Sequence, residues 1–254
     1  MNRLAGRVAV ITGSSRGMGL AIARGYAREG AHVVLTSRTV ASLTGFVEEL
    51  SQLGVRVLPL EVDVSRPEDV ERMVARVDES FGRVDVLVNN AGMPMVAPSE
   101  ELDLASWQRT LDTNLTGSFL CAQAAGRVML RQGSGCIINI ASLTSFLGFP
   151  GRLAYSATKS ALLGLTRTLS SEWAPRGIRV NALAPGWILT DLLQSVIDRG
   201  ALDPEKLISR TPLRRMGTPE DVVGPAIFLA SDESAFVTGQ ILPVDGGWLS
   251  YAFM

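Results

Sequence analysis

One stretch near the beginning of the chain indicates its fold: Val8-Ala9-Val10-Ile11-Thr12-Gly13-Ser14-Ser15-Arg16-Gly17-Met18-Gly19. Its first four residues predict a buried strand, and a helical pattern begins at Gly17. Gly13 can turn the chain, Gly17 lets the backbone approach a pyrophosphate, and Gly19 lets helix and strand pack closely. Because the helix start offers unpaired N–H groups, the stretch predicts a dinucleotide site. A P-loop is excluded, because no lysine follows the last glycine.

Strands and helices alternate along the rest of the chain. The expected strands are Val8–Ile11, Val33–Leu35, Val55–Leu58, Val84–Val88, Cys136–Ile140, Ile178–Leu183 and Ile241–Val244. The expected helices are Gly17–Glu29, Ala41–Gln52, Pro67–Phe81, Leu104–Arg131, Ala154–Trp173 and Pro219–Ala230. This order predicts an α/β protein with a doubly wound (Rossmann) fold, a seven-stranded parallel sheet with helices on both faces.

No linker or repeat divides the sequence, so residues 1–254 are expected to form a single dinucleotide-binding and catalytic domain. Within it, residues 186–217 interrupt the alternation with glycines and prolines. Such segments are often lids or binding loops, and we expect a substrate-binding loop here. The alternative is an inert surface excursion.

Composition excludes several classes of protein. A formal net charge of −1 without a basic stripe argues against nucleic acid as a partner. One histidine and two cysteines, without ligand-like spacing, argue against a metal site. No apolar stretch is long enough to span a bilayer, and no signal peptide is evident, so we expect a cytoplasmic protein without a membrane partner.

The end of the second strand indicates which dinucleotide binds. Where a carboxylate would accept the ribose hydroxyls of NAD(H), Ser37 stands instead, and Arg38 follows it. Arg38 and Arg16 can both reach a 2′-phosphate, since guanidinium groups suit bidentate phosphate recognition. We therefore predict NADP(H). The alternative is that Arg38 is a solvated surface charge and the cofactor is NAD(H).

Two further motifs fall at the carboxyl edge of the sheet, where open α/β sheets bind their ligands. Asp63 and Val64 follow the third strand, and Asn89-Asn90-Ala91-Gly92 ends the fourth.

A catalytic constellation is centred on Tyr155 and Lys159, which lie one helical turn apart. A free phenol has a pKa near about 10, and a lysine charge beside it favours the phenolate. Ser142, at the end of the fifth strand, can hydrogen-bond a substrate oxygen on which charge develops. The alternatives without a catalytic role are that Tyr155 and Lys159 form a surface contact and that Ser142 is a serine in the turn at the end of a strand.

These motifs together resemble those of the short-chain dehydrogenase/reductase family, over nearly the whole length from Arg7 to Trp248. The motifs that carry the resemblance are Thr12-Gly13-x-x-x-Gly17-x-Gly19, Asn89-Asn90-Ala91-Gly92, Asn114 within Leu111-Asp112-Thr113-Asn114-Leu115, Ser142, Tyr155-x-x-x-Lys159 and Pro185-Gly186.

The resemblance implies roles by position. Tyr155 is then the general acid/base, Lys159 binds the nicotinamide ribose and tunes Tyr155, and Ser142 holds the substrate carbonyl. Asn114 supports a water-linked proton relay to Lys159. The cofactor-binding set is Gly13, Ser15, Arg16, Gly17, Met18, Gly19, Ser37, Arg38, Asp63, Val64, Asn90, Ala91, Gly92, Tyr155, Lys159, Pro185, Gly186, Ile188 and Thr190. Family members are commonly homotetramers, so the same assembly is expected here.

The substrate is the least determined part. The pocket candidates are mostly apolar: Pro94, Met95, Leu143, Thr144, Phe149, Trp187, Leu192 and Leu193. They favour a hydrophobic or moderately polar ketone and an NADPH-dependent carbonyl reductase. A 3-oxoacyl thioester reductase and a polyol or sugar-acid dehydrogenase are the alternatives, because Arg210–Gly217 and Val244–Trp248 are similar to both subgroups. A catalytically silent dinucleotide sensor is a rival from another class, although it would not need the catalytic residues.

Overall fold

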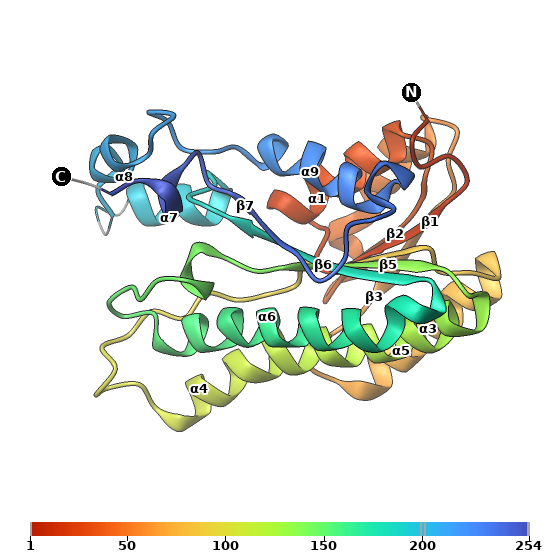
Figure 1. Ribbon diagram of the computed structural model, residues 1–254, viewed down its shortest axis with the longest axis horizontal. Coiled ribbons are helices and arrows are strands. Elements are labelled where there is room, and N and C mark those ends of the chain that lie inside the picture. The colour runs from red at the N-terminus through yellow and green to blue at the C-terminus, as the bar shows by residue number, and fades with distance from the viewer. Residues whose placement is uncertain (1, 199, 201, 253–254) are drawn as a thin grey trace.

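The computed structural model describes residues 2–198, 200 and 202–252. Their strands form one parallel sheet of seven strands in the order β3-β2-β1-β4-β5-β6-β7 (Figure 1). The strands are β1 Val8–Ile11, β2 His32–Ser37, β3 Val57–Glu61, β4 Val86–Asn89, β5 Gly135–Ile140, β6 Ile178–Pro185 and β7 Ile241–Val244. The predicted doubly wound sheet is confirmed.

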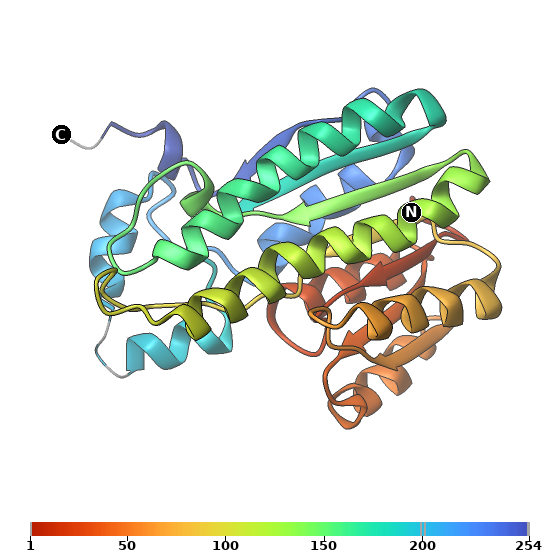
Figure 2. The same cartoon turned by 90° about the horizontal axis from the view of Figure 1, so that it is seen from below.

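The helices cover both faces of the sheet (Figure 1). They are α1 Gly17–Arg28, α2 Thr44–Ser51, α3 Pro67–Phe81, α4 Leu104–Leu111, α5 Gly117–Gln132, α6 Leu153–Trp173, α7 Asp191–Asp198, α8 Pro204–Arg210 and α9 Val223–Ala230. Helices α1, α2 and α9 lie on one face, and α3, α5 and α6 lie on the other. Figure 2 shows α5 and α6 side by side across this second face.

The strands are apolar at nearly every position because both of their faces are buried. In β1, Ala9 and Ile11 belong to the core under α1 and α9. Val8 and Val10 belong to the core under α3 and α5. Because successive side chains of a strand point to opposite faces of the sheet, the apolar run of β1 packs into both cores. This packing holds the carboxyl end of β1, where the glycine turn begins, in a fixed position.

Several predicted boundaries are wrong. The third strand runs from Val57 to Glu61 and not from Val55 to Leu58. The helices expected at residues 41–52 and 219–230 begin with 3₁₀ turns, Val40–Leu43 and Pro219–Val222. Such tight turns are frequent at helix ends, and apolar periodicity does not distinguish them from an α-helix.

The single helix predicted over residues 104–131 is interrupted by a π-helical turn at Asp112–Thr116. Asn114 lies in this turn and is fully buried. Its side chain accepts a hydrogen bond from the N–H of Met93 at 2.8 Å and donates one to the carbonyl of Met93 at 3.0 Å. These long-range contacts coincide with the extra residue in the turn, and π-bulges of this kind are frequent at functional sites.

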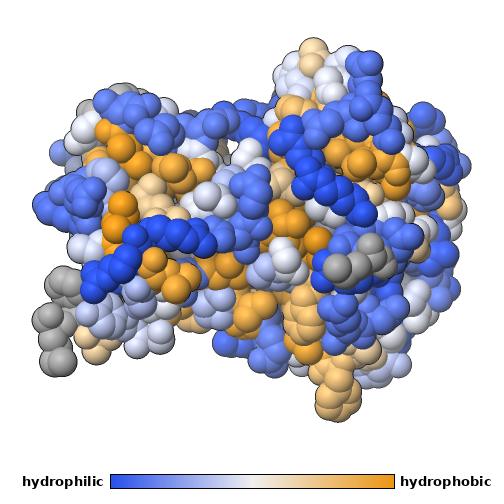
Figure 3. Space-filling view, turned by 90° about the horizontal axis from the view of Figure 1, so that it is seen from above, coloured by the Kyte–Doolittle hydropathy of each residue, from blue (hydrophilic) through white to orange (hydrophobic). Residues whose placement is uncertain are grey.

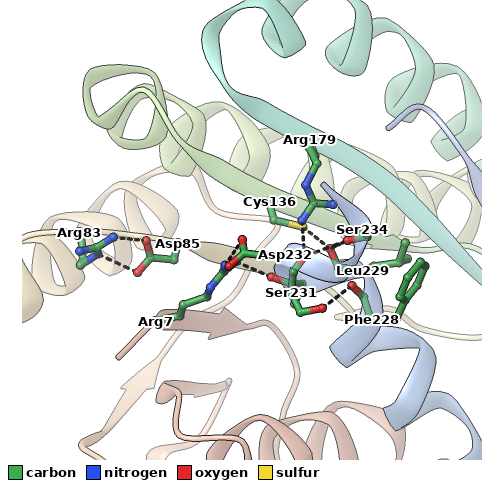
Figure 4. Close-up of polar contacts among 11 residues, drawn as sticks. Arg7, Arg83, Asp85, Cys136, Arg179, Phe228, Leu229, Ser231, Asp232 and Ser234 are labelled. Carbon is green, nitrogen blue, oxygen red and sulfur yellow. Dashed lines mark hydrogen bonds and ion pairs between the residues drawn. The ribbon is translucent and has the colours of Figure 1, made fainter. Parts of the chain in front are cut away.

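Polar contacts fasten the amino-terminal edge of the sheet, opposite the predicted site (Figure 4). Arg7 donates to the carbonyl of Ala230 at 2.6 Å and pairs with Asp232. Cys136 donates its S–H to the carbonyl of Leu229 at 3.1 Å, and burial raises the pKa of its thiol. The thiol is therefore an inert structural group that ties β5 to α9.

No helix in the described part of the chain is both long enough and apolar enough to cross a membrane. On the face shown in Figure 3, polar residues separate the apolar side chains into patches.

Candidate active site

The predicted catalytic residues meet at the carboxyl edge of the sheet, where the loops after β4, β5 and β6 surround a cavity of about 250 Å³. Ser142 follows β5, and Tyr155 and Lys159 lie in the first two turns of α6. All three line the cavity together with Asn90 and Gly92. The fold thus collects into one pocket residues that are separated in sequence.

Ser142 is fixed by the turn that follows β5. It is the N-cap of the 3₁₀ turn Leu143–Ser145, and its Oγ accepts a hydrogen bond from the N–H of Thr144 at 3.2 Å. Its side chain also lies close enough to that of Tyr155 to lower the pKa of the phenol. The two hydroxyls therefore lie next to each other, as binding of one substrate oxygen by both requires.

Burial raises the pKa of the Tyr155 phenol above its usual value, and the Ser142 hydrogen bond and the positive charge of Arg152 partly oppose this effect. Tyr155 is therefore a neutral proton donor at physiological pH. The ammonium of Lys159 lies 5.7 Å from the centre of the Tyr155 ring and donates a hydrogen bond to the carbonyl of Ile140. The tuning of the Tyr155 pKa by Lys159 stays a prediction.

Lys159 is buried, and its Nζ donates a hydrogen bond to the carbonyl of Ile140 at 2.6 Å. Burial lowers its pKa from 10.5 to about 8. A Cβ on Gly92 would lie 3.7 Å from this Nζ and 3.4 Å from the Oδ1 of Asn114. Gly92 therefore keeps open the space between Lys159 and Asn114.

Asn114 contacts Met93 through both ends of its amide, and its Nδ2 lies 3.3 Å from the Oγ1 of Thr158. It thereby fixes the loop after β4 to α6. The water-linked relay from Asn114 to Lys159 stays a prediction.

The glycine turn after β1 fits a pyrophosphate. Gly13 and Gly17 have φ of +63° and +54°, in the left-handed region that favours glycine. A Cβ on Gly19 would lie 2.4 Å from the Nδ2 of Asn90 and 2.5 Å from the carbonyl oxygen of Gly13. The N-cap of α1, Arg16, makes no side-chain cap, so the first N–H groups of the helix are left for an anion.

The motif after β4 supports this turn from beneath. The Nδ2 of Asn90 donates to the carbonyls of Thr12 and Gly13, at 2.8 and 3.0 Å. The Oγ1 of Thr12 accepts the N–H groups of Asn90 and Ala91, both at 2.9 Å. These side chains thus shape the cradle from below.

The predicted adenosine end is exposed at the end of β2. Arg16 and Arg38 are exposed, and within the described ranges neither forms a salt bridge. Asp63 accepts hydrogen bonds from the N–H and hydroxyl of Ser65, at 3.0 and 2.6 Å. Val64 is buried against α5. Ser15 and Ser37 are partly buried beside the arginines that follow them in sequence.

Residues 13–249 match a family model described as enoyl-(acyl carrier protein) reductase. The chain belongs to the short-chain dehydrogenase/reductase family. It is therefore an oxidoreductase of the kind that interconverts an alcohol and a carbonyl group.

Named members of this family align with the chain from end to end. A 3-oxoacyl-[acyl-carrier-protein] reductase of Synechocystis is 39% identical over 99% of this chain and 100% of its own length. Gluconate 5-dehydrogenase of Gluconobacter oxydans is 40% identical over 96% of this chain and 95% of its own. A crystal structure of a gluconate 5-dehydrogenase from Burkholderia cenocepacia, in complex with NADP and tartrate, is 39% identical, with a TM-score of 0.94 over 99% of this chain and 98% of that one.

Six of the eight predicted pocket residues of this short-chain dehydrogenase/reductase line the cavity: Pro94, Leu143, Thr144, Phe149, Trp187 and Leu193. Five of the predicted cofactor-binding residues line it as well: Met18, Pro185, Gly186, Ile188 and Thr190. Met95 is not among the described residues that line this cavity, whereas Met93, which is hydrogen-bonded to Asn114, is. The side chain of Leu192 lies outside the described part of the structure.

The sequence analysis also missed Arg152, which lines the cavity three residues before Tyr155. That spacing places both residues on one face at the start of α6, so the sequence could have indicated that Arg152 lies near Tyr155.

Proposed function

We propose that this protein transfers a hydride between NADP(H) and a ketone or secondary alcohol, as an NADPH-dependent carbonyl reductase, with Tyr155 as general acid/base. The observation that carries the proposal is that Ser142 and Tyr155 line one cavity together, close enough for Ser142 to lower the pKa of the phenol, and that Met18 and Gly92 also line it. The proton donor therefore lies in the same cavity as residues of the glycine turn and of the loop after β4.

When bound, the nicotinamide supplies or accepts the hydride. In the reductive direction, Ser142 and Tyr155 hold the carbonyl oxygen by hydrogen bonds, and Tyr155 gives it a proton as negative charge develops there. Lys159 would bind the nicotinamide ribose, and its positive charge favours the phenolate that Tyr155 becomes when it gives up its proton. In the oxidative direction Tyr155 accepts the alcohol proton.

Arg16 and Arg38 are exposed and have no salt-bridge partner among the described residues, which supports NADP(H) over NAD(H). Ser37 adds a hydroxyl donor and, unlike a carboxylate, does not repel a 2′-phosphate. The crystallised gluconate 5-dehydrogenase relative also holds NADP. The glycine cradle and the uncapped start of α1 fit the pyrophosphate of either dinucleotide.

Two narrower functions remain as alternatives within the same chemistry. Relatives of near-equal identity act as a 3-oxoacyl thioester reductase and as a gluconate dehydrogenase. A catalytically silent dinucleotide sensor would not need Ser142 and Tyr155 together in one cavity.

We further propose that residues 1–254 act as one domain, that residues 186–217, which contain α7 and α8, close over the substrate, and that the enzyme is a cytoplasmic homotetramer. Leu104, Phe119 and Leu153 are exposed apolar side chains on α4, α5 and α6, and they support contact between copies. Nucleic acid and membrane are not proposed as partners.

The proposal is tested by following NADPH and NADH absorbance with a panel of ketones, 3-oxoacyl thioesters and keto sugar acids. Turnover with NADPH in preference to NADH supports it. Tight NADPH binding without turnover of any compound would contradict it and support the sensor.

A further inference from the structure

The cavity beside Tyr155 is positively charged. Among its described lining residues, Arg152 and Lys159 are the charged ones, and no aspartate or glutamate occurs. Lys159 is engaged with the carbonyl of Ile140 at 2.6 Å. Within the described ranges, the guanidinium of Arg152 has neither a salt bridge nor a side-chain hydrogen bond, although the residue is partly buried. A half-desolvated cation without a counter-charge is costly, so its partner is expected from outside the chain.

The position of Arg152 in the fold does not allow it to stabilise helix α6. It is the N-cap of α6, it makes no side-chain cap, and no acidic residue stands in the first turn of that helix. The positive end of the helix dipole disfavours a cation there, and capping residues are normally Ser, Thr, Asp or Asn. The position therefore does not serve the stability of the helix.

The same position suits recognition of a substrate. Arg152 precedes Tyr155 by three residues, and its positive charge lowers the pKa of the phenol, partly opposing the effect of burial. Two other lining side chains carry polar atoms without hydrogen-bond partners in the described part, the Oγ1 of Thr144 and the Nε1 of Trp187. The cavity is thus more polar than the mostly apolar set predicted from sequence.

We propose that Arg152 binds a carboxylate of the substrate, so that the enzyme acts on keto acids and hydroxy acids in preference to neutral ketones. This inference rests on the proposed function and narrows its substrate class. A guanidinium pairs with a carboxylate through two parallel hydrogen bonds. Such a pair would hold the substrate while its carbonyl oxygen lies between Ser142 and Tyr155.

The test compares keto acids with their methyl esters, which keep the carbon skeleton and lose the charge. Suitable pairs are 3-oxobutanoate, 4-oxopentanoate and 5-oxohexanoate with the corresponding methyl esters. Each is assayed with NADPH and wild-type protein, Arg152→Gln, Arg152→Lys and the control Arg167→Gln. Arg167 is an exposed arginine farther along α6 and does not line the cavity.

We expect wild type to prefer the acid of at least one pair. Arg152→Gln should lower kcat/KM for that acid about 10- to 100-fold more than for its ester, mainly through KM. Arg152→Lys should recover part of the loss, and Arg167→Gln should behave as wild type. NADPH binding, followed by fluorescence, and thermal unfolding should be the same in all four proteins.

Equal use of acid and ester by wild type, or equal loss of both in Arg152→Gln, would overturn the assignment of Arg152 while leaving the carbonyl reductase intact. Failure of wild type to reduce any acid, ester, neutral ketone or thioester would instead overturn the proposed function, and this inference with it.

Discussion

The hydroxyl of Ser145 donates a hydrogen bond to the main-chain carbonyl of Lys159 at 2.7 Å. The hydroxyl oxygen of Ser145 also accepts a hydrogen bond from the N–H of Ser142 at 3.3 Å. One short side chain therefore joins the turn that carries Ser142 to the helix that carries Tyr155 and Lys159. Since catalysis depends on the mutual placement of these groups, Ser145 is a positioning residue for the whole site.

Replacing Ser145 by alanine should lower kcat about 10-fold, because Ser142 is no longer held against α6. Stability should fall by about 1 kcal/mol for the lost hydrogen bonds. NADPH affinity should stay the same, and Ser145→Thr should restore part of kcat. The control is Ser160→Ala, since Ser160 makes only long contacts with the same turn, at 3.3 and 3.4 Å. An unchanged kcat in Ser145→Ala would show that Ser142 is held by other contacts.

Replacing Tyr155 by phenylalanine should lower turnover about 100- to 10,000-fold, because the proton donor is lost. NADPH should still bind, which fluorescence titration will measure. Tyr26→Phe is the matched control. Tyr26 is buried far from the cavity and donates to the carbonyl of Ala226 at 2.9 Å, so this change should cost about 1 kcal/mol of stability and no activity. Near-normal turnover in Tyr155→Phe would mean that another group is the acid.

Replacing Lys159 by methionine should stabilise the protein without cofactor while abolishing activity. Burial lowers the pKa of Lys159 from 10.5 to about 8. Below pH 8 the lysine is charged in both the folded and unfolded states, and the folded state carries a desolvation cost of about 3 kcal/mol. As pH rises through 8, the folded protein loses this proton and the cost falls, so the advantage of methionine shrinks.

Urea unfolding at pH 6.5 and 9.5 measures this difference. Lys206→Met is the control, because Lys206 is the only other lysine in the sequence and its side chain is 84% exposed. The variant Lys159→Met must gain more stability at the lower pH. A gain that did not vary with pH would contradict the assignment of the lowered pKa.

Replacing Arg38 by aspartate should shift the cofactor preference towards NADH. Loss of a guanidinium–phosphate contact and repulsion by the new carboxylate should lower the NADPH/NADH ratio of kcat/KM by about 10- to 100-fold or more. Arg176→Asp serves as control, because Arg176 is an exposed arginine in the 3₁₀ turn that follows α6. An unchanged ratio in Arg38→Asp would refute the role of Arg38 in binding the 2′-phosphate.

Replacing Gly19 by alanine should weaken NADPH binding about 10-fold or more and destabilise the protein by about 1–3 kcal/mol. Its Cβ would meet Asn90 and the backbone oxygen of Gly13 within 2.5 Å, so the cradle must deform. Gly164→Ala is the matched control, because that Cβ meets nothing within 4 Å inside α6. This control should gain about 0.5–1 kcal/mol, and equal behaviour of the two variants would disprove the packing argument.

The sequence by itself determined the sheet and the position of its ligand edge. Apolar runs such as Val8–Ile11 must be buried on both faces, which requires a parallel sheet covered by helices. Glycines at turns indicate backbone conformations that residues with a Cβ rarely adopt. Local chemistry also sufficed for Tyr155 and Lys159, because one helical turn brings them onto the same face.

Only the tertiary structure decided the contacts between distant segments. The π-turn at Asn114 coincides with contacts to Met93, and the pKa of Tyr155 follows from burial more than from Lys159. No carboxylate is found beside Arg152 among the described residues that line the cavity. Burial and long-range hydrogen bonds depend on which segments meet in space, and periodicity along one segment does not contain that information.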